Sequence, residues 1–184
     1  MAIRIKAKLA TETYDPGVSR FLGSPVLPEE YLNMFDDTVL FLLQINLEEI
    51  AELDPENVLP HKGYLYFFLD TAEGEYNLKP IVKYYPGYPE NVVDDFNSVV
   101  PGYEDYVDEY LIEFSKCDDY ETGNKLLGKP NDWNYQDEPK KLLFQFDPLD
   151  SDMQLFDYMD GLFYFFFEGK TNEFDKVSLK EEIS

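Results

Sequence analysis

Residues 38–46 read Thr-Val-Leu-Phe-Leu-Leu-Gln-Ile-Asn, a nearly continuous apolar run that is too short to cross a membrane. Apolar runs of this length that are rich in strand formers are typical of β-strands buried on both faces. Gln44 interrupts the run, and its buried amide must find hydrogen-bond partners or cost about 1 to 3 kcal/mol. We therefore expect Gln44 to cap or bridge backbone groups inside the protein.

The buried run has a counterpart later in the chain, because three landmarks occur twice in the same order. The matched segments are Leu22-Gly23-Ser24-Pro25 and Leu127-Gly128-Lys129-Pro130, then Leu42-Leu43-Gln44-Ile45-Asn46 and Leu143-Phe144-Gln145-Phe146-Asp147, then Gly63-Tyr64-Leu65-Tyr66-Phe67-Phe68 and Gly161-Leu162-Phe163-Tyr164-Phe165-Phe166. From Gly to Gln the two copies span 21 and 17 residues, and from Gln to the next Gly 19 and 16. The pattern predicts a single domain over residues 1–184 with an internal repeat of about 19–85 and 124–170. Structural roles are expected at Gly23, Gln44, Gly63, Gly128, Gln145 and Gly161, with the two glutamines bridging backbone where the copies meet.

Other segments supply further strands. Ile3, Ile5 and Ala7 alternate with charged residues, which predicts a first strand with one buried face. Strands are also expected at residues 63–70, 79–85, 141–147, 161–168 and 177–183, and a short helix is expected at 47–53.

Residues 101–116 carry the clearest helix signal. Pro101 suits the first turn of a helix. Apolar residues then recur at steps of three and four, namely Tyr103, Tyr106, Val107, Tyr110, Leu111 and Phe114. Together with the strands, this amphipathic helix predicts an α+β fold. It would contain mostly antiparallel sheets built from a duplicated unit with a pseudo-twofold axis, and few other short helices.

The opposite face of this predicted helix is acidic. Its residues are Glu104, Asp105, Asp108, Glu109 and Glu113. Like charges at positions i and i+4 cost about 0.2 to 0.5 kcal/mol per pair, a penalty that Lys or Gln would avoid. We therefore predict that this acidic face binds a partner. The alternative is a solvated face in a generally acidic protein.

The whole chain is strongly acidic, with a formal charge of −23. Residues 1–20 hold four basic and two acidic residues, a balance of +2, so the other 164 residues carry −25. Such a field repels nucleic-acid phosphates and anionic lipid, and it accelerates encounter with basic proteins. We expect no nucleic-acid partner, no membrane partner and a basic protein partner. Charge that serves solubility alone is the alternative.

Two observations bear on the compartment. No run approaches the ~20 apolar residues of a membrane span, and the first residues lack the apolar stretch of a signal peptide. A single cysteine, Cys117, cannot form an internal disulfide. Both predict a cytoplasmic protein.

The repeated landmarks resemble a family of bacterial proteins of unknown function typified by YwqG. Residues 19–28, Ser-Arg-Phe-Leu-Gly-Ser-Pro-Val-Leu-Pro, resemble its opening turn; residues 41–47 and 63–68 resemble its two strands, and 125–130 its second turn. The chain departs from the family at Leu22 and Leu127, where the first glycine of a pair is usual, and in lacking the Trp-Pro that often follows the first turn. The resemblance implies an α+β fold with antiparallel sheets and an internal pseudo-twofold axis. It implies no activity.

Patterns that could carry chemistry are weak. Residues 123–130 fit the first seven positions of a phosphate-binding loop, but Pro130 replaces the hydroxyl residue that would hold Mg²⁺. His61 and Cys117 offer one Cys-His pair without a supporting sequence context. Carboxylates beside aromatic residues, as in a glycosidase, arise by chance in so acidic and aromatic a chain.

A metal site is also poorly supported. Asp147, Asp150 and Asp152 could supply oxygen ligands for Ca²⁺, but the glycine and terminal Glu of a calcium loop are missing. Turn formation around Pro148 explains these residues better. We therefore expect no cofactor, no metal and no catalytic residue.

These observations favour a non-enzymatic interaction protein that binds a basic partner, although they leave enzymatic activity open. Immunity-type neutralisation of a basic toxin is one concrete version. The alternative is a small-ligand-binding protein or hydrolase with a cleft between the two repeats, lined by aromatic and carboxylate groups. The sequence leaves the oligomeric state open.

Overall fold

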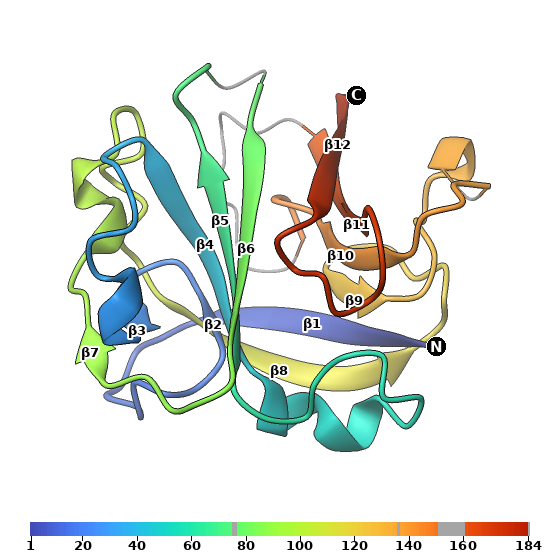
Figure 1. Ribbon diagram of the computed structural model, residues 1–184, viewed down its shortest axis with the longest axis horizontal. Helices are drawn as coiled ribbons and strands as arrows, with labels where there is room; N and C mark the ends of the chain where they lie inside the picture. The colour runs from blue at the N-terminus through green and yellow to red at the C-terminus, as the bar shows by residue number, and fades with distance from the viewer. Residues whose placement is uncertain (75–76, 136, 151–160, 184) are drawn as a thin grey trace.

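The computed structural model describes residues 1–74, 77–135, 137–150 and 161–183, and this part of the chain is mostly β (Figure 1). Its strands are β1 (Ala2–Leu9), β2 (Arg20–Phe21), β3 (Val26–Leu27), β4 (Val39–Asn46), β5 (Tyr64–Asp70), β6 (Lys79–Tyr85), β7 (Asn91–Val92), β8 (Tyr110–Cys117), β9 (Lys125–Leu127), β10 (Leu142–Phe146), β11 (Gly161–Phe167) and β12 (Val177–Ile183). The helical segments described are short 3-10 turns: η1 (Glu29–Tyr31), η2 (Leu47–Leu53), η3 (Phe96–Val99) and η4 (Trp133–Tyr135).

Ten strands form one sheet in the order β12-β11-β10-β9-β1-β8-β2-β4-β5-β6, and neighbours in it run antiparallel. The sheet coils so strongly that its two edge strands, β6 and β12, lie against each other and give a nearly closed, barrel-like shape (Figure 1). The ring of Tyr84 on β6 lies 5.6 Å from that of Phe174, just before β12. Strands β3 and β7 form a separate two-stranded sheet.

The strand order is symmetric about its centre. Counting inwards from the two edges matches β12 with β6, β11 with β5, β10 with β4, β9 with β2 and β1 with β8. Lys6 on β1 lies directly opposite Glu113 on β8 at the middle of the central ladder. A β-bulge between Phe41 and Leu43 on β4 is matched by one between Leu142 and Phe144 on β10.

The two halves, residues 1–100 and 101–184, share one core inside the coiled sheet. The ring of Phe21 lies 5.8 Å from that of Phe146, and the ring of Phe67 lies 5.0 Å from Phe144 and 5.5 Å from Phe165. Such aromatic pairs contribute about 0.5 to 1.5 kcal/mol each beyond the apolar area they bury. The inner space between the halves is therefore packed with rings.

The predicted α+β class is wrong, because the helix expected at residues 101–116 does not form. Residues before 110 make turns, and 110–117 form strand β8. From Tyr110 onwards the chain alternates: Tyr110 is buried, Ile112 and Phe114 pack against the core, and Glu113 points away. Residues four apart, such as Tyr110 and Phe114, lie on the same face of a helix and also on the same face of a strand, so the apolar pattern fitted both structures. Pairing with β1 along eight residues decides for the strand.

Other predicted elements form close to their expected bounds. The strands expected from residues 38, 63, 79, 141, 161 and 177 appear as β4, β5, β6, β10, β11 and β12, and the short helix at 47–53 forms as the 3-10 segment η2. No helix in the described part of the chain is long and apolar enough to cross a membrane.

Candidate functional site

The amide of Gln44 ties β4 to the segments before and after β2. Its Oε1 accepts a hydrogen bond from Val26 N at 2.8 Å, and its Nε2 donates to Pro16 O at 3.2 Å and Val18 O at 3.0 Å. Gln44 is fully buried. Both ends of the amide are therefore satisfied by backbone.

Gln145 makes the matching set of bonds in the second half. Its Oε1 accepts from Asn131 N at 3.0 Å, and its Nε2 donates to Glu121 O at 3.3 Å and Gly123 O at 2.7 Å. Each glutamine bridges backbone groups, but within its own half and not where the halves meet.

The turns that follow β2 and β9 also share their backbone shape. Leu22 and Gly23 have φ of 55° and 74°, and Leu127 and Gly128 have φ of 60° and 78°. A Cβ on Gly23 would lie 2.0 Å from Glu109 Cγ, so this position must be glycine for the side chain of Glu109 to pass.

The other two glycines of the repeat also lie against backbone. A Cβ on Gly63 would lie 2.2 Å from Tyr85 O, and one on Gly161 would lie 2.8 Å from Glu182 O. Gly63 has φ of 84° as well. Both positions therefore allow the chain to pass close to a neighbouring strand.

The two halves differ at the turn after β2. In the second half, the N–H of Lys129 donates to the backbone carbonyl of Asp119 at 2.9 Å. In the first half, the N–H of Ser24 donates to the side chain of Glu109, at 2.9 Å from Oε1. At the first turn, a carboxylate from the residue just before β8 thus takes the place that a backbone carbonyl has at the second turn.

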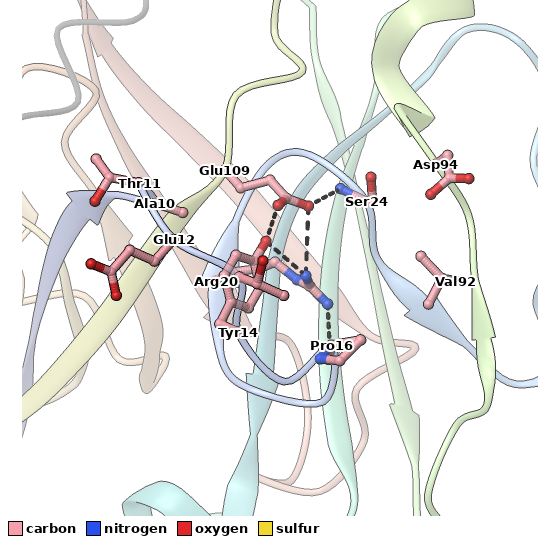
Figure 2. Close-up of a pocket in the computed structure, with 11 residues that line it drawn as sticks. Ala10, Thr11, Glu12, Tyr14, Pro16, Arg20, Ser24, Val92, Asp94 and Glu109 are labelled. Atoms are coloured by element: carbon pink, nitrogen blue, oxygen red, sulfur yellow. Dashed lines mark hydrogen bonds and ion pairs between the residues drawn. The ribbon is translucent and has the colours of Figure 1, made fainter.

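Glu109 is held by two more side chains (Figure 2). The hydroxyl of Tyr14 donates to its Oε2, and Arg20 Nη1 lies 3.6 Å from its Oε1. Arg20 Nη1 also donates to the Tyr14 hydroxyl at 3.1 Å, and Arg20 Nη2 donates to Pro16 O. The guanidinium is 2% exposed and lies over the Tyr14 ring.

These contacts affect the protonation of Tyr14. Burial raises the pKa of Tyr14, and its hydrogen bond to Glu109 raises that pKa further. Tyr14 therefore remains a neutral donor at physiological pH. The carboxylate of Glu109 and the guanidinium of Arg20 form a partly buried ion pair.

An open groove of about 580 Å³ lies over this cluster. Figure 2 shows Ala10, Thr11 and Glu12 along one side of it and Val92 and Asp94 along the other, with Glu109 and Ser24 between them. Both sides are anchored, because Ala10 N donates to Glu109 O at 2.8 Å and Asp95 N donates to Ser24 Oγ at 3.0 Å.

The carboxylates on the two sides have no counterion among the residues that the structure describes. Glu12 and Asp94 are exposed, and neither makes a hydrogen bond or ion pair with any described residue. Nothing in the described part of the chain gathers three His, Cys, Asp or Glu side chains for a metal. Two exposed carboxylates therefore line the groove from opposite sides.

The acidic residues predicted from the sequence do not share a helix face. Glu104, Asp105 and Asp108 are exposed in the turns before β8, and Glu113 is exposed on β8 opposite Lys6. Glu109 turns inward to the groove. The structure therefore brings one of the five, Glu109, into the groove cluster.

Sequence reasoning missed the groove residues Glu12, Tyr14, Arg20 and Asp94, because residues near 14, 20, 94 and 109 meet only in the fold. One signal was present. Arg20 comes just before the first turn, and Lys125 occupies the equivalent position before the second turn. Both cations are buried and donate hydrogen bonds to backbone carbonyls. The repeat could have indicated a buried cation at this position.

The other patterns that could have carried chemistry have structural roles. His61 Nε2 lies 3.4 Å from Asp54 Oδ2, and Asp54 accepts from the backbone N–H groups of Val58 and Leu59. Cys117 lies at the end of β8, opposite Ala2.

The candidate calcium ligands are likewise used by the fold. Asp150 binds Arg4 at 2.8 Å and accepts from Asn124 N at 2.8 Å, and Asp147 accepts from Leu149 N at 3.0 Å. Asp152 lies outside the described residues.

The fold and the groove together define a mostly β protein of two matched halves, with an open groove lined by residues of the first half and by Glu109 of the second. A family model described as a domain of unknown function, DUF1963, matches residues 19–88. The matched segment runs from β2 through β6, so it includes Arg20, Ser24 and Gln44 but not Glu109. No curated protein matches the chain.

Proposed function

We propose that this chain is a non-enzymatic interaction protein whose acidic groove receives a cationic side chain of a basic protein partner. The observation that carries the proposal is the pair of unpaired carboxylates, Glu12 and Asp94, on opposite sides of a groove whose floor carboxylate, Glu109, is already held in place. A guanidinium or ammonium group between the sides would relieve their repulsion and complete an ion-pair network.

The surroundings favour the same kind of partner. The chain has a formal charge of −23, and the exposed Glu104, Asp105 and Asp108 lie in the turns that lead into Glu109. A field of this sign steers basic proteins and repels acidic ones. Neutralisation of a basic toxin by an immunity-type protein is one activity that fits.

We also propose that the chain is a YwqG-like protein in which the family pattern occurs in both halves. Support comes from the match to a domain of unknown function over residues 19–88 and from the second turn, Lys125 to Pro130, which repeats the first. A cleft between the repeats, the alternative site, has less support because aromatic rings pack the space where the halves meet.

The test uses a short peptide that carries two arginines and the same peptide with citrulline at both positions. Calorimetry at low and high NaCl should show binding of the arginine peptide alone, with an affinity that falls as salt rises. The variant Glu12→Gln with Asp94→Asn should lose about tenfold in affinity, which corresponds to roughly 1.4 kcal/mol.

The matched control is Glu29→Gln with Glu30→Gln, which removes the same charge from two exposed residues of η1 that do not line the groove. It should bind the peptide within about twofold of the natural chain, because distant exposed charges act weakly in salt. Equal losses of affinity in the two variants would mean that peptide binding depends only on the net charge of the protein, and the groove proposal would then be wrong.

A further inference from the structure

The first strand of each half pairs with strands of the other half. Strand β1 pairs with β8 and β9, which both belong to residues 101–184. Strand β8 pairs with β1 and β2, which both belong to residues 1–100. Neither β1 nor β8 has a sheet partner in its own half within the described part of the chain.

Side chains follow the same exchange. Arg4 of β1 forms an ion pair with Asp150 at 2.8 Å, and the amine of Met1 forms one with Asp119 at 2.6 Å. In the other direction, Glu109, the residue before β8, is bound by Tyr14 and Ser24 of the first half. Each half thus supplies charged groups that are satisfied only by its partner half.

Packing makes the two halves mutually dependent. Ile3 and Ile5 of β1 are buried in the shared core, and a Cβ on Gly128 would meet Ala2 Cβ at 2.7 Å. Removal of β1 from the second half would expose these apolar residues and leave the edges of β8 and β9 without partners. Unpaired edges and exposed apolar surface are each costly.

We infer that the chain is a fused pair of half-length units that recognise each other by exchanging their first strands, and that this recognition does not need the covalent connection between them. The partner of each half is therefore the other half, bound through the central ladder of β1 and β8 and the shared aromatic core. This inference is independent of the proposed groove function.

The experiment uses the full chain with a site-specific protease sequence inserted between Pro101 and Gly102. Both residues are exposed, and a Cβ on Gly102 would have nothing within 4 Å, so the turn accepts an insertion. After cleavage, residues 1–101 and 102–184 should elute together at the mass of the whole chain and keep the circular dichroism of the uncut protein. Two separate folded fragments would overturn the inference.

A cysteine pair tests the exchanged strands themselves. Lys6 and Glu113 are directly opposite on β1 and β8, where paired Cβ atoms are about 4.5 to 5.5 Å apart. In a Cys117→Ser background, Lys6→Cys with Glu113→Cys should join the two cleaved fragments on mild oxidation. The control, Glu29→Cys with Glu113→Cys, should not, because Glu29 in η1 has no pairing with β8. Failure of the first pair to join fragments that stay together would also overturn the exchange.

Discussion

At the scale of single residues, the buried glutamines should be equally important in the two halves. Gln44→Leu would leave Val26 N without a partner, and Gln145→Leu would do the same to Asn131 N. Each substitution should lower the free energy of unfolding by about 1 to 3 kcal/mol, the cost of an unsatisfied buried group. Urea titration followed by circular dichroism measures the loss. The two losses should add in the double variant, because the glutamines share no partner.

A loss below about 0.5 kcal/mol in either variant would show that the amide is not what ties the strand to its turn. Gln44→Asn and Gln145→Asn serve as controls for the change in side-chain volume. Asn keeps the amide but is one methylene shorter, so it should recover little of the stability.

Lys125 is a buried cation that forms no ion pair with a carboxylate in the described part of the chain. Its Nζ donates to Asp119 O at 2.8 Å and Glu121 O at 2.7 Å, and the residue is fully buried. Burial lowers the pKa of Lys125 from 10.5 to about 8. A base whose pKa is lower in the folded state binds fewer protons there than in the unfolded chain, so stability should rise with pH between about 8 and 10.5.

We predict that this rise is lost in Lys125→Met. The difference in unfolding free energy between the natural chain and the variant should grow from pH 8 to pH 10, as measured by urea titration at each pH. Taking the difference removes the titration of the tyrosines, which both proteins share. Lys125→Arg, which copies Arg20 of the first half, keeps its charge throughout and is the control. A difference that is flat across this range would contradict the prediction.

At the scale of elements, strands with continuous apolar runs were predictable because burial on both faces leaves a local signature. Strands β4, β5, β10 and β11 are of this kind, and all four start within one residue of the expected position. Strand β8 was not predictable, because its spacing fits a helix as well and its partners β1 and β2 are distant in sequence. Long-range pairing overrode the local pattern.

The candidate site shows the same limit. Glu109 was named from the sequence, but as part of an exposed helix face, whereas the structure places it between Tyr14, Arg20 and Ser24. Its partners lie more than eighty residues away along the chain. The equivalent turns were predictable from the repeat, but the different hydrogen-bond acceptors at the two turns were not.

The paired turns after β2 and β9 allow a controlled test of the groove. Gly23→Ala and Gly128→Ala each place a Cβ where φ is positive, at 74° and 78°, so both should lose about 1 kcal/mol or more of stability. Gly23→Ala should also displace Glu109, because the new Cβ would lie 2.0 Å from Glu109 Cγ.

Calorimetry with the arginine peptide separates the two effects. We expect Gly23→Ala to weaken peptide binding several-fold and Gly128→Ala to leave it unchanged, since the second turn has no contact with the groove. Equal peptide affinities in the two variants would show that Glu109 and its turn do not support the binding groove.

At the scale of the whole molecule, the symmetric strand order explains how both halves contribute to one core. Matched strands lie at equal distances from the centre of the sheet. The central strands, β1 and β8, pair with each other and so join the two halves. The connection between them, residues 93–109, consists of turns and η3 and carries Asp94 and Glu109 of the groove. Val100, Tyr103 and Tyr106 of this connection are buried in the core, so the segment fills the core as well as carrying two residues of the groove.

The exchange also predicts how the protein should behave when it refolds at high concentration. Nothing in the β1–β8 and β1–β9 ladders requires the two halves to come from the same molecule, so the first half of one chain can pair with the second half of another. The covalent connection gives the internal partner an effective concentration of about millimolar, which favours the monomer in dilute solution.

Refolding from urea at a protein concentration near that value should therefore yield a dimer that persists on dilution, whereas dilute refolding should yield monomer. Size-exclusion chromatography with light scattering distinguishes the two. Shortening the connection by deleting Asp94 and Asp95 should raise the dimer fraction, because it strains the internal pairing. A monomer at every refolding concentration, in both the natural and the shortened chain, would show that the halves recognise each other only within one chain.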